Sequence, residues 1–213
     1  MRLGNNHMPV DSKNDAHHPS QEADQADLES TLLKISLGFK LMFRPGDAWM
    51  ELSRHQITSF DVLTYLIILF PPAFFARGLG RKMVGASFAH SILEAFFFFF
   101  LIGCVTLGCS VIVMMFSNRD QKRMMKPVAL MTYSSTPLWI FGLLYLIPVP
   151  EIHPYIFLFS FAIAGYLLFR GLFITFGIDA HQTLLIASLT TMMWVITSTI
   201  FCHIFLGVLF AYL

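Results

Sequence analysis

Charged residues are scarce in this sequence, at 13 % of the chain against 56 % hydrophobic residues. Soluble domains average about 25 % charged residues. A water-soluble chain of 213 residues could not cover this much apolar surface with so few charged groups. The mean hydropathy of +0.66 agrees, and the composition predicts a membrane protein.

Cysteine and basic charge are also in short supply. Three cysteines are too few for a secreted disulfide scaffold, and 14 Lys and Arg against 13 Asp and Glu leave no basic surplus for nucleic acid. The chain contains no phosphate-binding loop, GxSxG elbow or dinucleotide fingerprint. We therefore expect neither an enzyme nor a cofactor, and no nucleic-acid partner.

The chain divides into three parts by composition. Residues 1–29 carry six acidic side chains and hardly any large apolar residue, which predicts a disordered, acidic cytoplasmic tail. Residues 30–56 mix apolar residues with spaced bases, which predicts an amphipathic collar lying in the membrane interface. Residues 57–213 are predicted to form the membrane domain.

The collar has candidate interfacial anchors in Lys40, Arg44 and Trp49. Lysine and arginine reach toward headgroups, and tryptophan is enriched at the membrane surface. The alternative is an ordinary cytosolic helical hairpin packed on the spans.

The membrane domain contains apolar segments of about the length that a spanning helix needs, and we predict an all-α, polytopic five-helix bundle. The prolines at positions 71 and 72 make the first segment the weakest, because they should kink or unwind its far end. The predicted spans are Phe60–Ala76, Ser87–Phe116, Pro127–Ile147, Pro154–Ile178 and Thr183–Leu213.

The distribution of Lys and Arg predicts the orientation. Alternate loops carry seven basic residues on the N-terminal side and three on the other, so the N-terminus is expected in the cytoplasm and the C-terminus in the periplasm. The three basic residues on the other side, which disagree with this orientation, are Arg77, Arg81 and Lys82. In an alternative topology the first segment dips into the membrane and returns, which would place them on the cytoplasmic side.

Polar residues within the spans need an explanation, because ionisable groups are costly there. Arg170 is predicted at the same depth as a polar run in the third span, where Pro137 frees the carbonyl of Tyr133. Asp61 and Asp179 are its candidate carboxylate partners. The cluster is either a polar vestibule open to the cytoplasm or a set of groups that pin helices together; its run consists of Tyr133, Ser134, Ser135 and Thr136.

A weak metal-site signal lies at the opposite membrane surface. His90 and Glu94 are four residues apart and share a helix side, while Glu151 and His153 arrive from the next turn on that surface. Two imidazoles and two carboxylates suit a divalent cation such as zinc. Interfacial His and Glu residues also commonly face water.

The spans also carry a family resemblance. The run YSSTPL from Tyr133 to Leu138, continuing through Gly142–Leu144, resembles the third span of Yip-domain membrane proteins. The run GYLLFRGL at 165–172 is similar to the family's fourth span, and RPGDAW at 44–49 resembles the element that precedes the first span in bacterial members. The resemblance covers about residues 43–213 and implies five spans.

Two departures limit what the resemblance implies. The Asp-Leu-Tyr-Gly-Pro element of eukaryotic Yip proteins is absent, so their trafficking role and Rab GTPase binding are not carried over. Arg170 stands where an aliphatic or aromatic residue is expected. The resemblance to bacterial members implies an inner-membrane protein and supplies no catalytic residues.

These features together predict a non-catalytic scaffold or accessory subunit of a bacterial inner membrane. Its expected partners are the lipid bilayer and other membrane-protein subunits or further copies of itself. The alternative is a small-solute or ion transporter or channel, with a cytoplasm-facing vestibule around Arg170 and Tyr133.

Overall fold

The computed structural model describes residues 29, 32–33, 35–116 and 125–211. The tail predicted over 1–29 lies outside them except for Glu29, as do residues 117–124. In the described residues all regular structure is helical. The helices are α2 (Pro45–Arg54), α3 (Ser59–Met83), α4 (Phe88–Phe116), α5 (Met125–Ser134), α6 (Thr136–Phe141), η2 (Gly142–Leu146), η3 (Pro150–Ile152), α7 (His153–Phe176) and α8 (Ala180–Ala211).

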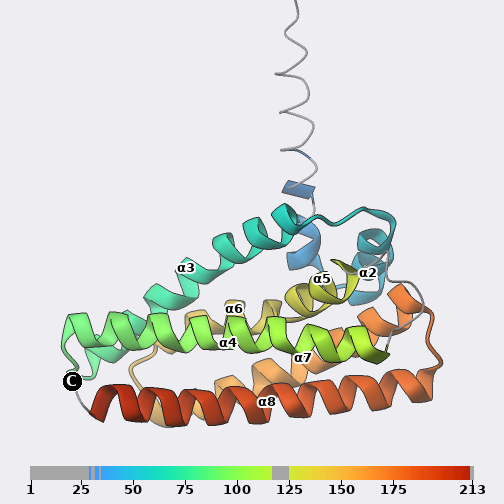
Figure 1. Ribbon diagram of the computed structural model, residues 1–213. Helices are drawn as coiled ribbons and strands as arrows, with labels where there is room; N and C mark the ends of the chain where they lie inside the picture. The colour runs from blue at the N-terminus through green and yellow to red at the C-terminus, as the bar shows by residue number, and fades with distance from the viewer. Residues whose placement is uncertain (1–28, 30–31, 34, 117–124, 212–213) are drawn as a thin grey trace, which may run out of the picture.

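The described residues include five helical stretches long and apolar enough to cross a membrane. They run back and forth, so that their ends gather at two opposite ends of the bundle (Figure 1). We call the end where α3 begins and α7 ends the proximal end, and the end where α3 ends and α4 begins the distal end. This arrangement confirms the predicted all-α, five-helix membrane architecture.

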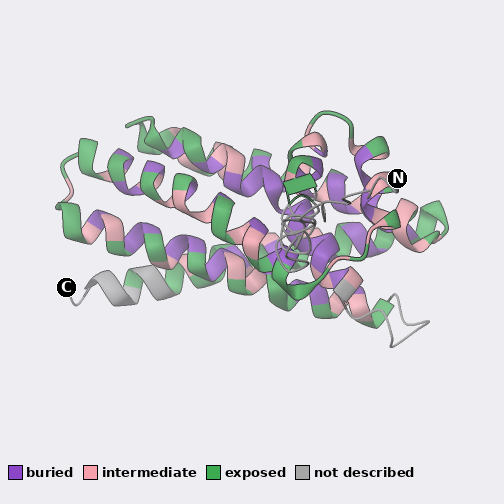
Figure 2. Ribbon diagram, turned by 90° about the horizontal axis from the view of Figure 1, so that it is seen from above, coloured by how far each residue is buried: buried purple, intermediate pink, exposed green. Residues whose placement is uncertain are grey.

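The third span is the centre of the bundle. Of its most apolar stretch, 72 % is buried, against 28–39 % for the other four spans, and Figure 2 shows exposed positions along the outer faces of the helices. The sequence predicted one span here, but the structure divides it into α5, α6 and the 3₁₀ turn η2. The break falls just before Pro137, whose ring cannot continue the α-helical bonding.

The first span is more regular than the sequence predicted. The helix α3 runs unbroken through Pro71 and Pro72 to Met83, so the expected unwinding does not occur, and α3 is long and apolar enough to cross a membrane by itself. Small residues explain its close packing on η2. Ala73 is fully buried, and a Cβ added at Gly142 would lie 2.8 Å from the Cβ of Ala73. Such close helix contacts hold a proline-containing helix in place.

The collar packs on the bundle. Trp49 was expected at the lipid interface, but it is only 2 % exposed, and its indole Nε1 donates to the carbonyl of Leu167 in α7 at 3.0 Å. Leu41 and Leu52 are buried in the same core. The alternative of a hairpin packed on the spans describes this region better, because the apolar face of α2 is covered by protein.

Candidate functional site

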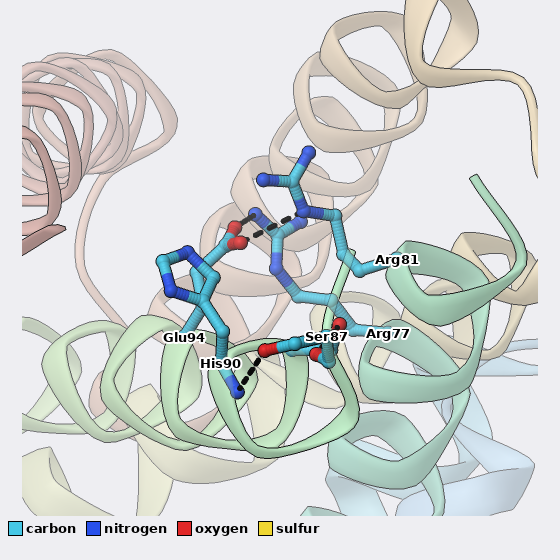
Figure 3. Close-up of polar contacts among 6 residues, drawn as sticks. Arg77, Arg81, Ser87, His90 and Glu94 are labelled. Carbon is cyan, nitrogen blue, oxygen red and sulfur yellow. Dashed lines mark hydrogen bonds and ion pairs between the residues drawn. The ribbon is translucent and has the colours of Figure 1, made fainter. Parts of the chain in front are cut away.

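A guanidinium–carboxylate cluster occupies the distal end of the bundle. Arg77 and Arg81, one turn apart on α3, both donate to Glu94 of α4 (Figure 3). Arg77 Nη2 lies 3.0 Å from Glu94 Oε1, and Arg81 Nε lies 2.7 Å from Oε2. The side chains of Arg77 and Glu94 are 12 % and 9 % exposed, whereas that of Arg81 is 36 % exposed. One carboxylate therefore serves two cations, and the cluster carries a net positive charge.

Aromatic rings hold Arg77 in place. Its guanidinium carbon lies 3.7 Å from the ring centroid of Phe98 and 5.0 Å from that of Tyr145. A cation over an aromatic face is attracted to the negative face of the ring's quadrupole, more strongly where water is excluded. Arg77 is thus fixed by an ion pair and two rings, and it serves the packing of α3, α4 and η2.

The four candidate metal ligands do not assemble. In the part of the chain that the structure describes, no group of three or more His, Cys, Asp and Glu side chains is placed to hold a metal ion. Both oxygens of Glu94 face guanidinium groups, and His153 Nε2 lies 3.1 Å from the carbonyl of Ile147. The backbone N–H of His90 donates to the Ser87 hydroxyl, and Glu151 is exposed. The Glu94 carboxylate, one of the two predicted acidic metal ligands, is instead paired with Arg77 and Arg81.

A hydroxyl cluster lies in the proximal half of the bundle. Thr136 Oγ1 donates to the carbonyl of Tyr133 at 2.5 Å, which is the carbonyl that Pro137 leaves without its usual partner. The Thr136 hydroxyl has one hydrogen, so Tyr65 of α3 is the donor in the 2.5 Å contact between Tyr65 Oη and Thr136 Oγ1. Ser135 in turn accepts from Trp139 Nε1 at 2.8 Å. The cluster joins α3 to the broken third span.

This cluster is closed. The predicted run Tyr133–Thr136 is fully buried, as is Tyr65, so no open vestibule lies at these residues. Among the described residues, Tyr133 Oη and Ser134 Oγ have no hydrogen-bond partner. The arrangement favours helix pinning over a path for a solute.

The three charged residues assigned to this cluster each make contacts of their own, and Asp61 lies within electrostatic reach of Tyr133. Arg170 reaches α2, where a Cβ added at Gly46 would lie 3.0 Å from Arg170 Nη2. Asp61 forms a capping box with Thr58 at the start of α3, and Asp179 accepts from the backbone N–H of His181 near the start of α8. Both carboxylates therefore stabilise helix starts.

The charged collar residues lie at the protein surface. Lys40 Nζ lies 2.9 Å from Glu51 Oε2, and both side chains are partly exposed. The hydrogen bond from Lys40 lowers the pKa of Glu51 below its usual value. Arg44 is exposed. Lys40 and Arg44 thus lie at the protein surface, unlike Trp49.

An apolar groove of about 600 Å³ runs between α7 and α8. Its lining includes the small residues Gly165, Ala187 and Ser188 between larger ones such as Tyr166 and Met192. Thr191 lies in the groove opposite Gly165, and its hydroxyl is buried with no hydrogen-bond partner among the described residues. The Thr191 hydroxyl is therefore enclosed between α7 and α8, and the surface of the groove is apolar.

Sequence reasoning missed two features of these sites. Tyr65 was not assigned to the hydroxyl cluster, although it follows Asp61 by four residues and so shares its helix face. Arg77 and Arg81 were counted as loop charges, although consecutive helices that meet at a short turn bring such residues opposite Glu94. The sequence places the basic residues Arg77 and Arg81 before that turn and the acidic Glu94 after it, and this pattern could have indicated the ion pair.

Comparison with known proteins gives one family. The model of the Yip1 domain family matches residues 39–202. No curated protein and no solved structure matches the chain. The match covers the collar from residue 39 onward and nearly all of the five candidate spans.

Proposed function

Because this chain belongs to the Yip1 domain family of multi-pass membrane proteins, we propose that it acts without catalysis as a scaffold or accessory subunit. In this proposal it binds a transmembrane helix of another membrane protein in the groove between α7 and α8. The groove is the observation that supports the proposal. At each end of the bundle, buried polar groups join one helix to another. Such cross-links between helices are what a rigid scaffold requires.

The chemistry of the groove favours a helix as its occupant. Small residues such as Gly165, Ala187 and Ser188 allow a second backbone to approach closely.

A pair of neighbouring substitutions on α8 tests this function. Ser188→Trp fills the groove, and Leu189→Trp places the same ring on an exposed position outside the groove lining. Native mass spectrometry after mild detergent extraction should show a complex heavier than the 24.2 kDa monomer. We expect Ser188→Trp to remove the added mass and Leu189→Trp to retain it.

Three results would contradict the proposal. An unchanged complex in Ser188→Trp would exclude the groove. An added mass equal to a whole number of 24.2 kDa chains would identify a second copy as the occupant. Solute flux through the purified protein in liposomes would favour a transporter.

We further propose a bacterial inner-membrane location with the N-terminus in the cytoplasm. The distal end holds the three basic residues that disagreed with this orientation. Two of them share a carboxylate with each other, and Arg77 is buried against Phe98. The positive-inside rule describes basic residues of short loops. Arg77 is paired within the bundle and lies outside such a loop, so it counts less against a cytoplasmic N-terminus. Reporter fusions at the two termini should report opposite sides of the membrane, and the same side would overturn the orientation.

A further inference from the structure

We propose that the distal end of α3 binds the phosphate group of an anionic phospholipid, with Arg81 and Lys82 as its ligands. This site is separate from the α7–α8 groove and does not depend on the function proposed above. It rests on the unbalanced charge of the guanidinium–carboxylate cluster, the free donors of Arg81 and the exposed apolar residues beside them.

The charge of the cluster comes first. Glu94 neutralises one of the two arginines, and Arg77 is held deepest, against the ring of Phe98. Arg81 is the more exposed partner, and Lys82 next to it is exposed and 5.2 Å from the ring centroid of Phe88. The described residues offer no further carboxylate within ion-pair distance of Arg81 or Lys82. Two positive charges therefore lack a counter-ion within the described protein.

The geometry of Arg81 leaves its outer edge free. Its hydrogen bond to Glu94 uses Nε, and Figure 3 marks no contact between its two terminal nitrogens and the other residues drawn. A guanidinium edge carries parallel N–H donors that fit two oxygens of a phosphate, and such charge-assisted pairs are among the stronger hydrogen bonds. Lys82 adds a flexible point charge from the adjacent position.

The turn after α3 removes competing acceptors. The backbone N–H of Gly85 donates to the carbonyl of Lys82 at 3.0 Å, and that of Ala86 donates to the carbonyl of Arg81 at 3.3 Å. The carbonyls of Arg81 and Lys82 are thus occupied by the turn itself. The N-terminal end of α4, which carries the positive end of its helix dipole, begins at Phe88 in the same turn. The positive end of the α4 dipole thus offsets the negative end of the α3 dipole, which lies at Arg81 and Lys82.

The surroundings indicate a lipid as the source of the phosphate. The exposed side chains beside the two basic residues are large and apolar, and they extend both down α3 and across the turn. They are Leu79 at 42 %, Met83 at 64 %, Val84 at 43 % and Phe88 at 55 % exposure. The end of a spanning helix lies at headgroup depth, where the long side chains of Lys and Arg reach the headgroups. Acyl chains would cover these apolar side chains, which a free anion would leave exposed.

The test is a lipid titration of delipidated protein in detergent, followed by native mass spectrometry. The ligands are phosphatidylglycerol and, separately, inorganic phosphate. The site variant is Arg81→Gln with Lys82→Gln, and the matched control replaces Arg54, an exposed base at the last turn of α2, by Gln. Lys82→Gln alone takes no ion pair away, so it provides a second variant if the double variant fails to fold.

We expect the double variant to weaken phosphatidylglycerol binding about tenfold or more, Lys82→Gln to weaken it several-fold, and Arg54→Gln to leave it unchanged. Equal binding by the wild type and both site variants would overturn the proposal, as would an equal loss in Arg54→Gln. If inorganic phosphate binds as tightly as the lipid and displaces it, the lipid source is wrong.

Discussion

The two ends of this bundle hold their helices together in different ways. At the distal end, two guanidinium groups share one carboxylate across the α3–α4 turn. In the proximal half, neutral hydroxyls bond to one another and to the carbonyl freed by Pro137. Buried charge makes the distal end sensitive to the loss of a single group, because the remaining charges cannot be left unpaired. The hydroxyl cluster distributes its stabilisation over several modest bonds.

Removing the shared carboxylate should have the largest effect. We expect Glu94→Gln to lower the free energy of unfolding by about 3–5 kcal/mol, because it leaves the buried Arg77 without a counter-ion. Thermal unfolding in detergent, followed by circular dichroism, measures the change. The control is Glu51→Gln, which breaks a surface pair and should have little effect. A melting temperature for Glu94→Gln equal to that of the wild type would remove the contrast between the two ends.

Added methyl groups test how tightly each end is packed. A Cβ at Gly80 would fall on the backbone carbonyl of Tyr145, whereas one at Gly171 would meet side chains, including Trp49 Cε2 at 2.8 Å. We expect Gly80→Ala to cost about 1–3 kcal/mol of unfolding free energy and Gly171→Ala less, since side chains adjust more easily than backbone.

Gly103 supplies the control for this pair, because an added Cβ there meets nothing within 4 Å. Gly103→Ala should leave the stability unchanged or raise it by up to about 1 kcal/mol through helix propensity. Thermal unfolding of the three variants gives the order. If Gly171→Ala were the most damaging, the proximal packing would be the more rigid.

Substitutions in the hydroxyl cluster are expected to lower the free energy of unfolding by less than Glu94→Gln does. Tyr65→Phe removes the hydrogen bond between α3 and α6, and interhelical hydrogen bonds in membranes average about 0.6 kcal/mol. Thr136→Val removes the same bond and also the donor to the Tyr133 carbonyl, so its cost should be the larger of the two. Unfolding in detergent with increasing denaturant measures both. A cost for Tyr65→Phe as large as that for Glu94→Gln would contradict the distinction between the ends.

The smallest expected effect is a pH dependence at the collar. The Lys40 hydrogen bond lowers the pKa of Glu51 in the folded protein. The stability from this pair is therefore present above the ordinary glutamate pKa of about 4.3 and is lost as the pH falls through the lower folded-state value. The difference in melting temperature between the wild type and Glu51→Gln should be small at pH 7 and vanish in acid. A difference in melting temperature that grew in acid would mean that folding raises the pKa of Glu51, which would contradict this prediction.

The sequence predicted the helix content and the five spans because long apolar stretches are a local property of the chain. It also identified the carbonyl freed by Pro137, since a proline acts on its own helix. The partners of the charged residues were harder to identify. Arg170 was matched to the hydroxyl cluster by depth alone, and depth does not say which side of the helix faces inward. The structure places the terminal nitrogen Nη2 of Arg170 close to Gly46 of α2, a neighbour that the sequence did not indicate.

Spacing along the chain thus determined by itself where helices lie, which of them can cross a membrane and where a proline interrupts their bonding. The tertiary structure alone decided that Trp49 is a core residue, that Glu94 serves two arginines and that Tyr65 closes the hydroxyl cluster. The reason is that these contacts join different helices, and their relative rotation depends on the packing of whole surfaces.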